Sequence, residues 1–185
     1  LVTGATGFIG GNLVRALIAR GYDVRALVRE QSRGLTLEDM GVEEALGDVR
    51  DRESVARALR GCQAVFHCAA LYTFWSPEPR ELYRINVEGT KTVFEEALKS
   101  GVRGAVYTST VSTIGIPKNG VGTEDMEPSH RDLIGHYKYS KYQGEKEALK
   151  AVLNGLPVVV VNPTAPVGPW DVKPTPTGEI ILGFL

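Results

Sequence analysis

Short apolar runs alternate with longer amphipathic segments along this chain, and a glycine recurs at one place in the pattern. Four predicted helices end at a glycine just before an apolar, β-branched run, at Gly21, Gly61, Gly101 and Gly155. Glycine suits that place because the residue after a helix commonly takes left-handed backbone. The predicted helices begin near Phe8 and span 53–60, 88–100 and 141–153, and the strands that follow them span 22–28, 64–68, 105–108 and 158–161. These repeated units predict an α/β fold, a doubly wound parallel sheet of the Rossmann type with helices on both faces.

The first ten residues predict a strand, a glycine turn and a helix start. Gly4 permits the tight turn, Gly7 lets the backbone approach a phosphate, and Gly10 allows close packing of the helix. The free N–H groups and the dipole of such a helix favour a phosphate or pyrophosphate. A bare structural turn explains the three glycines equally well until the rest of the chain is considered.

Length and charge narrow the possible functions. The 185 residues suffice for one sizeable core, and the formal net charge of −1 gives no reason to expect nucleic acid or an anionic membrane as partner. No apolar run is long enough for membrane insertion. Cys62 and Cys68 lack metal-ligand partners at suitable spacing, so we expect no metal and two reduced thiols in a cytoplasmic protein.

Both ends of the sequence suggest a partial chain. There is no initiator Met and Leu1 already lies in an apolar run, so we expect leading residues to be missing. Five of the ten prolines fall between Pro163 and Pro176, which predicts an interruption of regular packing after the last strand. We therefore expect a dinucleotide-binding domain over residues 1–170 and the start of a truncated second domain over residues 171–185.

The residues that follow each strand are the candidates for ligand contact, since ligands bind beyond the carboxyl ends of a parallel sheet. Arg29 follows the second strand, where a carboxylate would favour NAD, so NADP is expected and NAD remains possible. Arg33 offers a second cation, and Glu30 weakens the preference for NADP. The alternative for Arg29 is a plain surface charge.

Three other strand ends carry polar residues. Asp48 could meet an adenine amino group, or it could serve as a turn residue or as a cap for the helix beginning near Asp51. His67 is more typical of a satisfied structural histidine than of a catalyst. The run 108–110, Thr-Ser-Thr, places hydroxyls at the end of the fifth predicted strand.

The spacing of Tyr137 and Lys141 indicates acid–base chemistry. Residues four apart share one face of a helix. A nearby ammonium favours the phenolate, so we expect Lys141 to lower the pKa of Tyr137 toward neutrality. A glycine turn and a strand that ends in hydroxyl residues also occur in this chain. Together with them, the pair becomes a strong indication of acid–base chemistry.

Taken together, these segments resemble the extended short-chain dehydrogenase/reductase family, also called the NAD-dependent epimerase/dehydratase family. The matching segments are 4–10 (GATGFIG), 48–49 (DV), 67–70 (HCAA), 86–90 (NVEGT), 108–110 (TST), 137–141 (YKYSK) and 162–169 (NPTAPVGP). Residues 28–29 and 162–164 look like the dihydroflavonol-reductase-like branch. Residues 71–75, 134–137 and 173–178 look most like the hopanoid-associated sugar epimerases of bacteria.

The resemblance implies roles for individual residues. Tyr137 is the expected acid/base, Lys141 holds the nicotinamide ribose, and Thr110 binds the substrate oxygen where many relatives have Ser. Asn86 supports the local geometry or a proton path, although a helix-capping role is open. The expected cofactor-binding residues are Gly4, Thr6, Gly7, Phe8, Ile9, Gly10, Arg29, Asp48, Val49, Cys68, Ala69, Ala70, Thr108, Tyr137, Lys141, Pro163 and Thr164.

Three functions follow from the resemblance. The first is an NAD(P)-dependent oxidoreductase or epimerase that acts on a secondary alcohol or ketone of a nucleotide-sugar-like molecule. The second is a dihydroflavonol-reductase-like ketone or aldehyde reductase, and the third is an NADP-sensing regulator without turnover. The aromatic segment 71–75 could contact substrate or simply pack in the core. The family also implies a possible homodimer.

Overall fold

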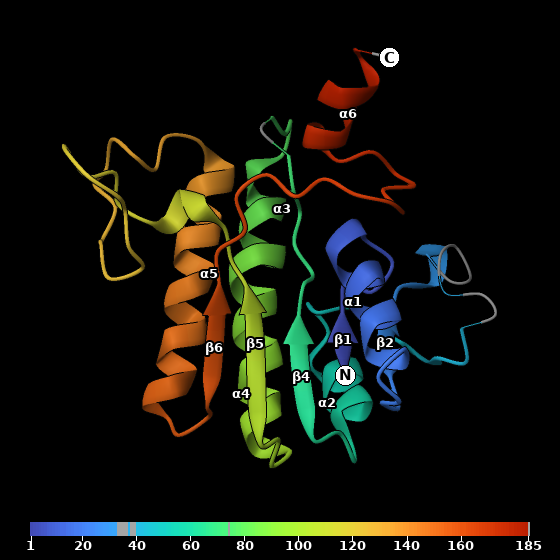
Figure 1. Cartoon of the computed structure of the whole chain (residues 1–185). Helices are drawn as coiled ribbons and strands as arrows, with labels where there is room; N and C mark the ends of the chain where they lie inside the picture. Colours follow the sequence, from blue (N-terminus) through green and yellow to red (C-terminus); the bar gives the residue numbers. More distant parts are fainter. Residues whose placement is uncertain (33–36, 38–39, 74, 185) are drawn as a thin grey trace.

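The computed structural model describes residues 1–32, 37, 40–73 and 75–184. Within them, a six-stranded sheet has the order β3-β2-β1-β4-β5-β6, and all neighbouring strands run parallel. The strands are β1 (Val2–Thr3), β2 (Arg25–Val28), β3 (Glu43–Leu46), β4 (Ala64–His67), β5 (Gly104–Thr108) and β6 (Val158–Val161). The predicted doubly wound sheet is confirmed (Figure 1).

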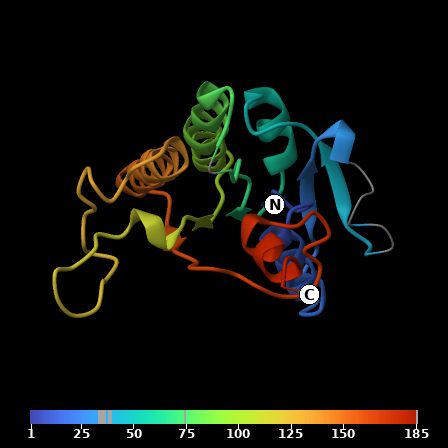
Figure 2. The same ribbon diagram turned by 90° about the horizontal axis from the view of Figure 1, so that it is seen from above.

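Helices cover both faces of the sheet, as Figure 2 shows from above. On one face lie α2 (Arg52–Leu59), α4 (Thr90–Lys99) and α5 (His136–Leu153), and α1 (Phe8–Ile18) lies on the other. The larger core cluster joins Leu59, Phe94 and Ala148 of these helices to Val65 and Tyr107 of the sheet. A smaller cluster packs Val14 of α1 against β1 and β2. The helices thus pack on the two faces of the sheet, and the candidate site lies at its carboxyl edge.

The four predicted glycine stops are confirmed by the backbone. Positive φ angles occur at Gly21 (78°), Gly61 (77°), Gly101 (70°) and Gly155 (95°). After α1 the N–H of Tyr22 returns to the Leu17 carbonyl at 3.2 Å, which closes the turn. The second strand consequently begins at Arg25 and is shorter than the predicted span 22–28.

The helical segment before β5 starts earlier than the sequence pattern predicts. A short helix α3 (Pro79–Tyr83) leads into a π-helix (Arg84–Gly89), which continues directly into α4. Pro79 sits in the first turn of α3, where its missing N–H costs nothing. The predicted start at residue 88 was therefore wrong, and Asn86 lies inside the helical run.

The chain beyond β6 also contains regular structure that the prolines did not suggest. Helix α6 (Pro176–Leu182) begins after Thr175, whose hydroxyl accepts a hydrogen bond from the Gly178 N–H at 3.2 Å. Two 3₁₀ turns, Glu30–Ser32 and Val111–Thr113, complete the elements. Among the described residues, no helix combines the length and apolar character that crossing a membrane requires.

Candidate functional site

A groove of about 1030 Å³ runs along the carboxyl edge of the sheet. All of the predicted cofactor-binding residues line it, and so does Thr110. They come from the first glycine turn, the ends of β2 to β6, and the start of α5. The structure therefore brings together residues that are far apart in the sequence, whereas Asn86 lies outside the groove lining.

Two of the three glycines at the first turn have no room for a side chain. Gly4 has a φ of +69°, and a Cβ there would lie 2.6 Å from the Ala69 backbone nitrogen. A Cβ on Gly10 would lie 2.1 Å from the Gly4 carbonyl oxygen, so α1 packs directly on the turn. The N–H of Gly7 donates to that carbonyl at 3.0 Å. The turn is thus fixed by close backbone contacts that any larger residue would break.

The first turn of α1 suits an anionic group. Gly7 caps the helix without a side-chain hydrogen bond, and no acidic residue lies in the first turn. The positive end of the helix dipole and the free N–H groups therefore face the groove without a competing carboxylate. These features fit the pyrophosphate of a dinucleotide.

Tyr137 lies beside Thr110 and next to an aromatic ring from the loop after β4. Both residues line the groove, and an interaction with the Thr110 side chain acts to lower the pKa of Tyr137. The ring of Tyr72 lies 4.9 Å from that of Tyr137, centroid to centroid, so the segment after β4 does overhang the site. Phe74 in the same segment lies outside the described residues. Tyr137 and Thr110 thus line the same groove, and a direct bond between the phenol and the threonine hydroxyl stays a prediction.

The pKa of Tyr137 moves in the direction opposite to the sequence expectation. Burial raises it, neighbouring Tyr72 and Tyr107 raise it further, and the hydrogen bond with Thr110 acts against them. The expected lowering was wrong for this structure because burial, a tertiary property, outweighs any stabilisation of the phenolate. At neutral pH the phenol holds its proton.

Lys141 lines the groove but is almost completely buried. Its side chain is 2% exposed, and its Nζ donates to the Thr108 carbonyl at 2.8 Å and lies 4.6 Å from the centre of the Tyr107 ring. Burial lowers its pKa to about 8, although the charges of Cys68 and Glu145 oppose this. Lys141 thus remains largely an ammonium at neutral pH, with a reduced affinity for its proton.

Asn86 fastens the overhanging loop to α5. Its Oδ1 accepts from the Leu71 N–H at 2.7 Å, and its Nδ2 contacts the Leu71 carbonyl at 3.1 Å and the Ser140 hydroxyl at 3.0 Å. It is buried within the π-helix and does not cap a helix. The capping alternative was therefore wrong, and the contacts fit the role in local geometry.

His67 is a satisfied structural residue, as expected. Its two ring nitrogens contact the hydroxyls of Thr3 at 2.7 Å and of Thr90 at 2.9 Å. Burial lowers its pKa to about 3, with a further contribution from the charge of Lys141. The ring is therefore neutral over the physiological range.

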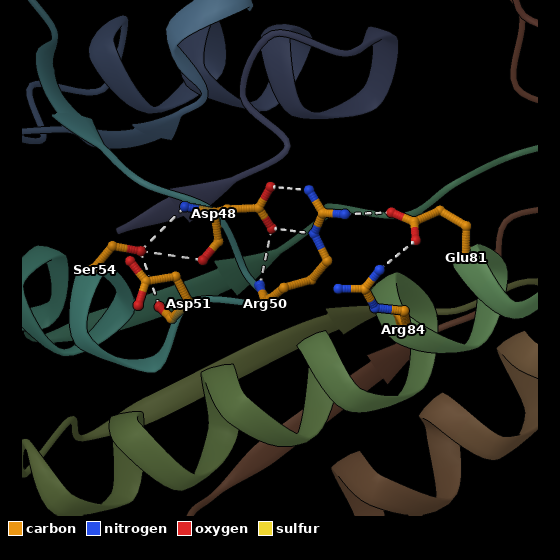
Figure 3. A network of polar contacts seen from close by, with 6 residues as sticks. All are labelled: Asp48, Arg50, Asp51, Ser54, Glu81 and Arg84. Carbon is orange, nitrogen blue, oxygen red and sulfur yellow. Dashed lines mark hydrogen bonds and ion pairs between the residues drawn. The ribbon is translucent and has the colours of Figure 1, made fainter.

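At the other end of the groove, Asp48 forms part of a chain of exposed charges, shown in Figure 3. Its Oδ1 accepts from the Arg50 N–H at 2.9 Å and its Oδ2 from the guanidinium at 2.7 Å. Arg50 also pairs with Glu81, which in turn contacts Arg84. These contacts fit the turn role of Asp48, and they hold its pKa below the usual carboxyl range.

Asp51, and not Asp48, caps α2, with its carboxylate accepting from the Glu53 N–H at 3.1 Å. The capping alternative for Asp48 was therefore wrong. Arg29 lines the groove at the end of β2 and is exposed. Arg33, the second cation proposed for the same end, lies outside the described residues.

Sequence reasoning missed a polar cluster centred on Glu145. One carboxylate oxygen, Oε2, is contacted by the hydroxyls of Ser109 and Thr113 and by the side-chain amide of Asn162. The available signal was spacing, because Tyr137, Lys141 and Glu145 follow one another at intervals of four on α5. Across the described ranges, no group of three or more His, Cys, Asp or Glu side chains is arranged to hold a metal ion.

Comparisons with known proteins place the chain in a family. The family model "NAD dependent epimerase/dehydratase family" matches residues 1–184. The chain is 48% identical, over its whole length, to a putative dihydroflavonol 4-reductase of Synechocystis sp., covering 54% of that protein. It is 42% identical, again over its whole length, to sterol demethylase protein B of Methylococcus capsulatus, covering 56%.

A solved structure gives the same assignment. The UDP-glucose 4-epimerase of Thermus thermophilus, in complex with NAD, superposes with a TM-score of 0.83 at 26% identity. The match covers 98% of this chain and 60% of that one, so the chain spans about half the length of the curated relatives and somewhat more of this structure. The resemblance read from the sequence is confirmed, and the chain belongs to the NAD-dependent epimerase/dehydratase family.

Proposed function

We propose that the protein is an NAD(P)-dependent oxidoreductase or epimerase that transfers hydride at a secondary alcohol or ketone. The observation that carries this proposal is the convergence of Tyr137, Thr110 and Lys141 in the groove that also contains the first glycine turn. The groove contains a turn that fits a pyrophosphate and, at another point, an acid–base group. This combination matches the chemistry of a nicotinamide dinucleotide.

The bound dinucleotide supplies or accepts the hydride, and the protein supplies alignment and proton transfer. The Thr110 hydroxyl holds the substrate oxygen next to the Tyr137 phenol. Tyr137 donates its proton to that oxygen during reduction and takes it back during oxidation. Lys141 holds the nicotinamide ribose and places a positive charge below Tyr137, which favours loss of the phenolic proton.

The cofactor preference is proposed to be NADP. Arg29 lies at the groove edge after β2, where an arginine fork suits a 2′-phosphate. Asp48 and Val49 line the same end and would meet the adenine. The Asp48 carboxylate already accepts from Arg50, so an adenine amino group would share it with that guanidinium.

A nucleotide-sugar-like molecule is the first substrate class proposed, with epimerisation as the net reaction. It is supported by the fold likeness to a UDP-glucose 4-epimerase over nearly the whole chain. An epimerase removes and returns the hydride within one cycle, so the cofactor is not consumed. The same three residues serve both halves of that cycle.

A one-way ketone or aldehyde reductase is the second candidate, and two observations favour it. The raised pKa of Tyr137 keeps the phenol protonated at neutral pH, which suits delivery of a proton to a carbonyl. The putative dihydroflavonol 4-reductase is also considerably more similar in sequence than the epimerase.

One experiment separates the two candidates. The natural full-length protein is incubated with UDP-glucose and catalytic NADP or NAD, and in parallel with dihydroquercetin and stoichiometric NADPH. Sugar product without net change in cofactor absorbance supports the epimerase. Loss of NADPH absorbance with the dihydroflavonol supports the reductase, and no conversion of either probe argues against both of these substrate classes.

Substitution of Tyr137 by Phe tests the catalytic role itself. Loss of general acid–base catalysis lowers kcat by ~10²- to 10⁴-fold. The affinity for NADPH, measured by fluorescence titration, should stay nearly unchanged because the ring and its packing remain. Tyr139→Phe, on the same turn of α5, is the control. Unchanged turnover in Tyr137→Phe would refute the acid/base role of Tyr137. Binding of NADPH by the wild type without turnover of any probe would instead fit an NADP-sensing protein.

A further inference from the structure

Glu145 joins three parts of the chain that meet at the substrate side of the groove. Its Oε2 is contacted by the hydroxyl of Ser109 at the end of β5, by Thr113 Oγ1 at 2.7 Å and by Asn162 Nδ2 at 3.2 Å just after β6. Glu145 itself lies on α5 and is half-buried. A single carboxylate oxygen therefore ties the ends of two strands to a helix.

The same donors surround the backbone of Thr110. Thr113 Oγ1 lies 2.7 Å, and Asn162 Nδ2 3.2 Å, from the Thr110 carbonyl oxygen, and Asn162 Nδ2 lies 3.0 Å from Thr113 Oγ1. Thr113 has one hydroxyl proton and serves one acceptor at a time, whereas the Asn162 amide has two hydrogens to share. An acceptor as strong as a carboxylate organises these donors into one arrangement.

The geometry relates this cluster to the acid–base group. Tyr137 and Glu145 are two helical turns apart on α5, so their spacing is fixed by the helix. One end of that face carries Tyr137, which lines the same groove as Thr110 and interacts with it, and the other end holds the segment from which Thr110 projects. The helix thus contacts Thr110 directly through Tyr137 and indirectly through Glu145.

We propose that Glu145 is a positioning residue, which fixes Thr110 against Tyr137 by ordering the hydrogen bonds of Ser109, Thr113 and Asn162. This inference rests on the proposed function, in which Thr110 binds the substrate oxygen. Glu145 touches neither substrate nor cofactor, because it lies behind the Thr110 segment and outside the groove lining.

The charge of Glu145 adds a second effect on the same site. Lys141 is one turn away on α5, and burial lowers its pKa to about 8 while the Glu145 carboxylate acts in the raising direction. Removal of the negative charge lowers the pKa of Lys141 further. The ammonium is then lost at a lower pH, which moves the alkaline limb of the activity profile in the same direction.

The test uses Glu145→Gln in the natural full-length protein, with NADPH and dihydroquercetin or UDP-glucose as the probe that the wild type converts. In this variant we expect kcat to be ~10- to 100-fold lower and the Kd for NADPH to be nearly unchanged. The alkaline limb of the pH–activity profile should shift to lower pH. Glu145→Asp keeps the negative charge but has a shorter side chain. In this variant kcat should fall, while the alkaline limb of the pH–activity profile should stay where it is in the wild type. Glu147→Gln, which breaks only an exposed pair with Lys150, is the matched control.

Coupling to Thr110 distinguishes positioning from general stability. In a Thr110→Ala background, Glu145→Gln should cause little further loss, because the group that it positions is already absent. A full additive loss, or kcat values for both Glu145 variants equal to that of Glu147→Gln, overturns the proposal. If Glu145→Gln fails to fold, Thr113→Val removes one donor, and it should show the same coupling to Thr110.

A readout without turnover separates this inference from the proposed function. Threonine-methyl NMR of the apo protein follows the Thr110 signal, assigned through Thr110→Ala. A shift or broadening of that signal in Glu145→Gln, but not in Glu147→Gln, supports positioning even if no probe is converted. An unchanged Thr110 signal overturns the inference even if the wild type is an active reductase or epimerase.

Discussion

The two ends of the groove use charge in opposite ways. At the ends of β5 and β6 the titratable groups are enclosed, with Lys141 2% exposed and Tyr137 packed against Tyr72. At the ends of β2 and β3 the charges are on the surface, where the Asp48 and Arg50 side chains are 24% and 32% exposed. Burial changes the pKa values at the first end, whereas water and salt screen the ion pairs at the second.

Under the proposed function, this difference predicts that the enclosed end sets the rate and the open end sets the choice of cofactor. A buried group with a shifted pKa costs stability and is typical of a site that performs chemistry. An exposed arginine costs little and is suited to recognising a ligand that is itself charged. Substitutions at the enclosed end should therefore alter kcat. Substitutions at the open end should alter the affinity for the cofactor, or should have almost no effect on either quantity.

The largest expected effect comes from Lys141→Met, which keeps the volume of the side chain and removes its charge. The phenolic proton of Tyr137 is then harder to remove, and kcat should fall by ~100-fold or more. Steady-state kinetics against Lys138→Met, a half-buried lysine on the same helix, provide the comparison. Equal kcat values for Lys141→Met and Lys138→Met would contradict the idea that the enclosed end of the groove sets the rate.

Stability as a function of pH gives a second, independent measure of the enclosed end. Between a folded pKa of about 8 and an unfolded value of about 10.4, the unfolded chain holds a proton on Lys141 that the folded chain has lost. The contribution of Lys141 to the free energy of unfolding therefore rises with pH across this window. Denaturant unfolding of the apo protein should show this rise relative to Lys141→Met, and parallel curves would contradict it.

Arg29→Ala should have an intermediate effect that is confined to one cofactor. Loss of a charge-assisted contact with a phosphate costs about 1.5–3 kcal/mol, or ~10- to 100-fold in the Kd of NADPH. Binding of NADH lacks that contact and should change little. Equal weakening of both cofactors would fit Arg29 as a plain surface charge.

The smallest expected effect belongs to Arg50→Gln at the open end. Exposed ion pairs contribute about 0–1 kcal/mol each, so thermal unfolding should shift by little more than in Arg57→Gln, which contacts Glu53 at 3.8 Å. Because Arg50 lowers the pKa of Asp48, the difference between wild type and variant should shrink as pH falls through the carboxyl range. A large loss of stability at neutral pH would show that this end is as tightly coupled as the other.

Local signals in the sequence predicted most of the fold. Glycines at 21, 61, 101 and 155 marked the helix ends because each of these positions has a positive φ, which glycine adopts easily. Such a preference belongs to a single residue and can therefore be seen in the sequence. The signals for α3 and α6 were also local, a proline in the first turn of each and Thr175 as a cap, but the prolines between 163 and 176 suggested an interruption of regular packing. The groove lining followed in part from the rule that ligands bind beyond the strand ends and in part from the family resemblance.

Features that depend on packing could not be predicted in the same way. The pKa direction of Tyr137 was wrong because a spacing of four residues shows a neighbouring charge but gives no measure of burial. The role of Glu145 was missed because its partners lie 36 and 32 positions before it and 17 after it. Long-range contacts of this kind require the relative placement of β5, β6 and α5.

The segment after β6 is attached to the first helix of the chain. Asn12 Nδ2 donates to the Pro169 carbonyl at 3.1 Å, and the Arg15 guanidinium lies 4.3 Å from the centre of the Trp170 ring, whose residue has a φ of 70°. The groove is therefore lined by residues from the first glycine turn and by residues 172–177 of the segment after β6. The same two contacts on α1 therefore hold in place a part of the groove wall that begins more than 150 residues later in the sequence.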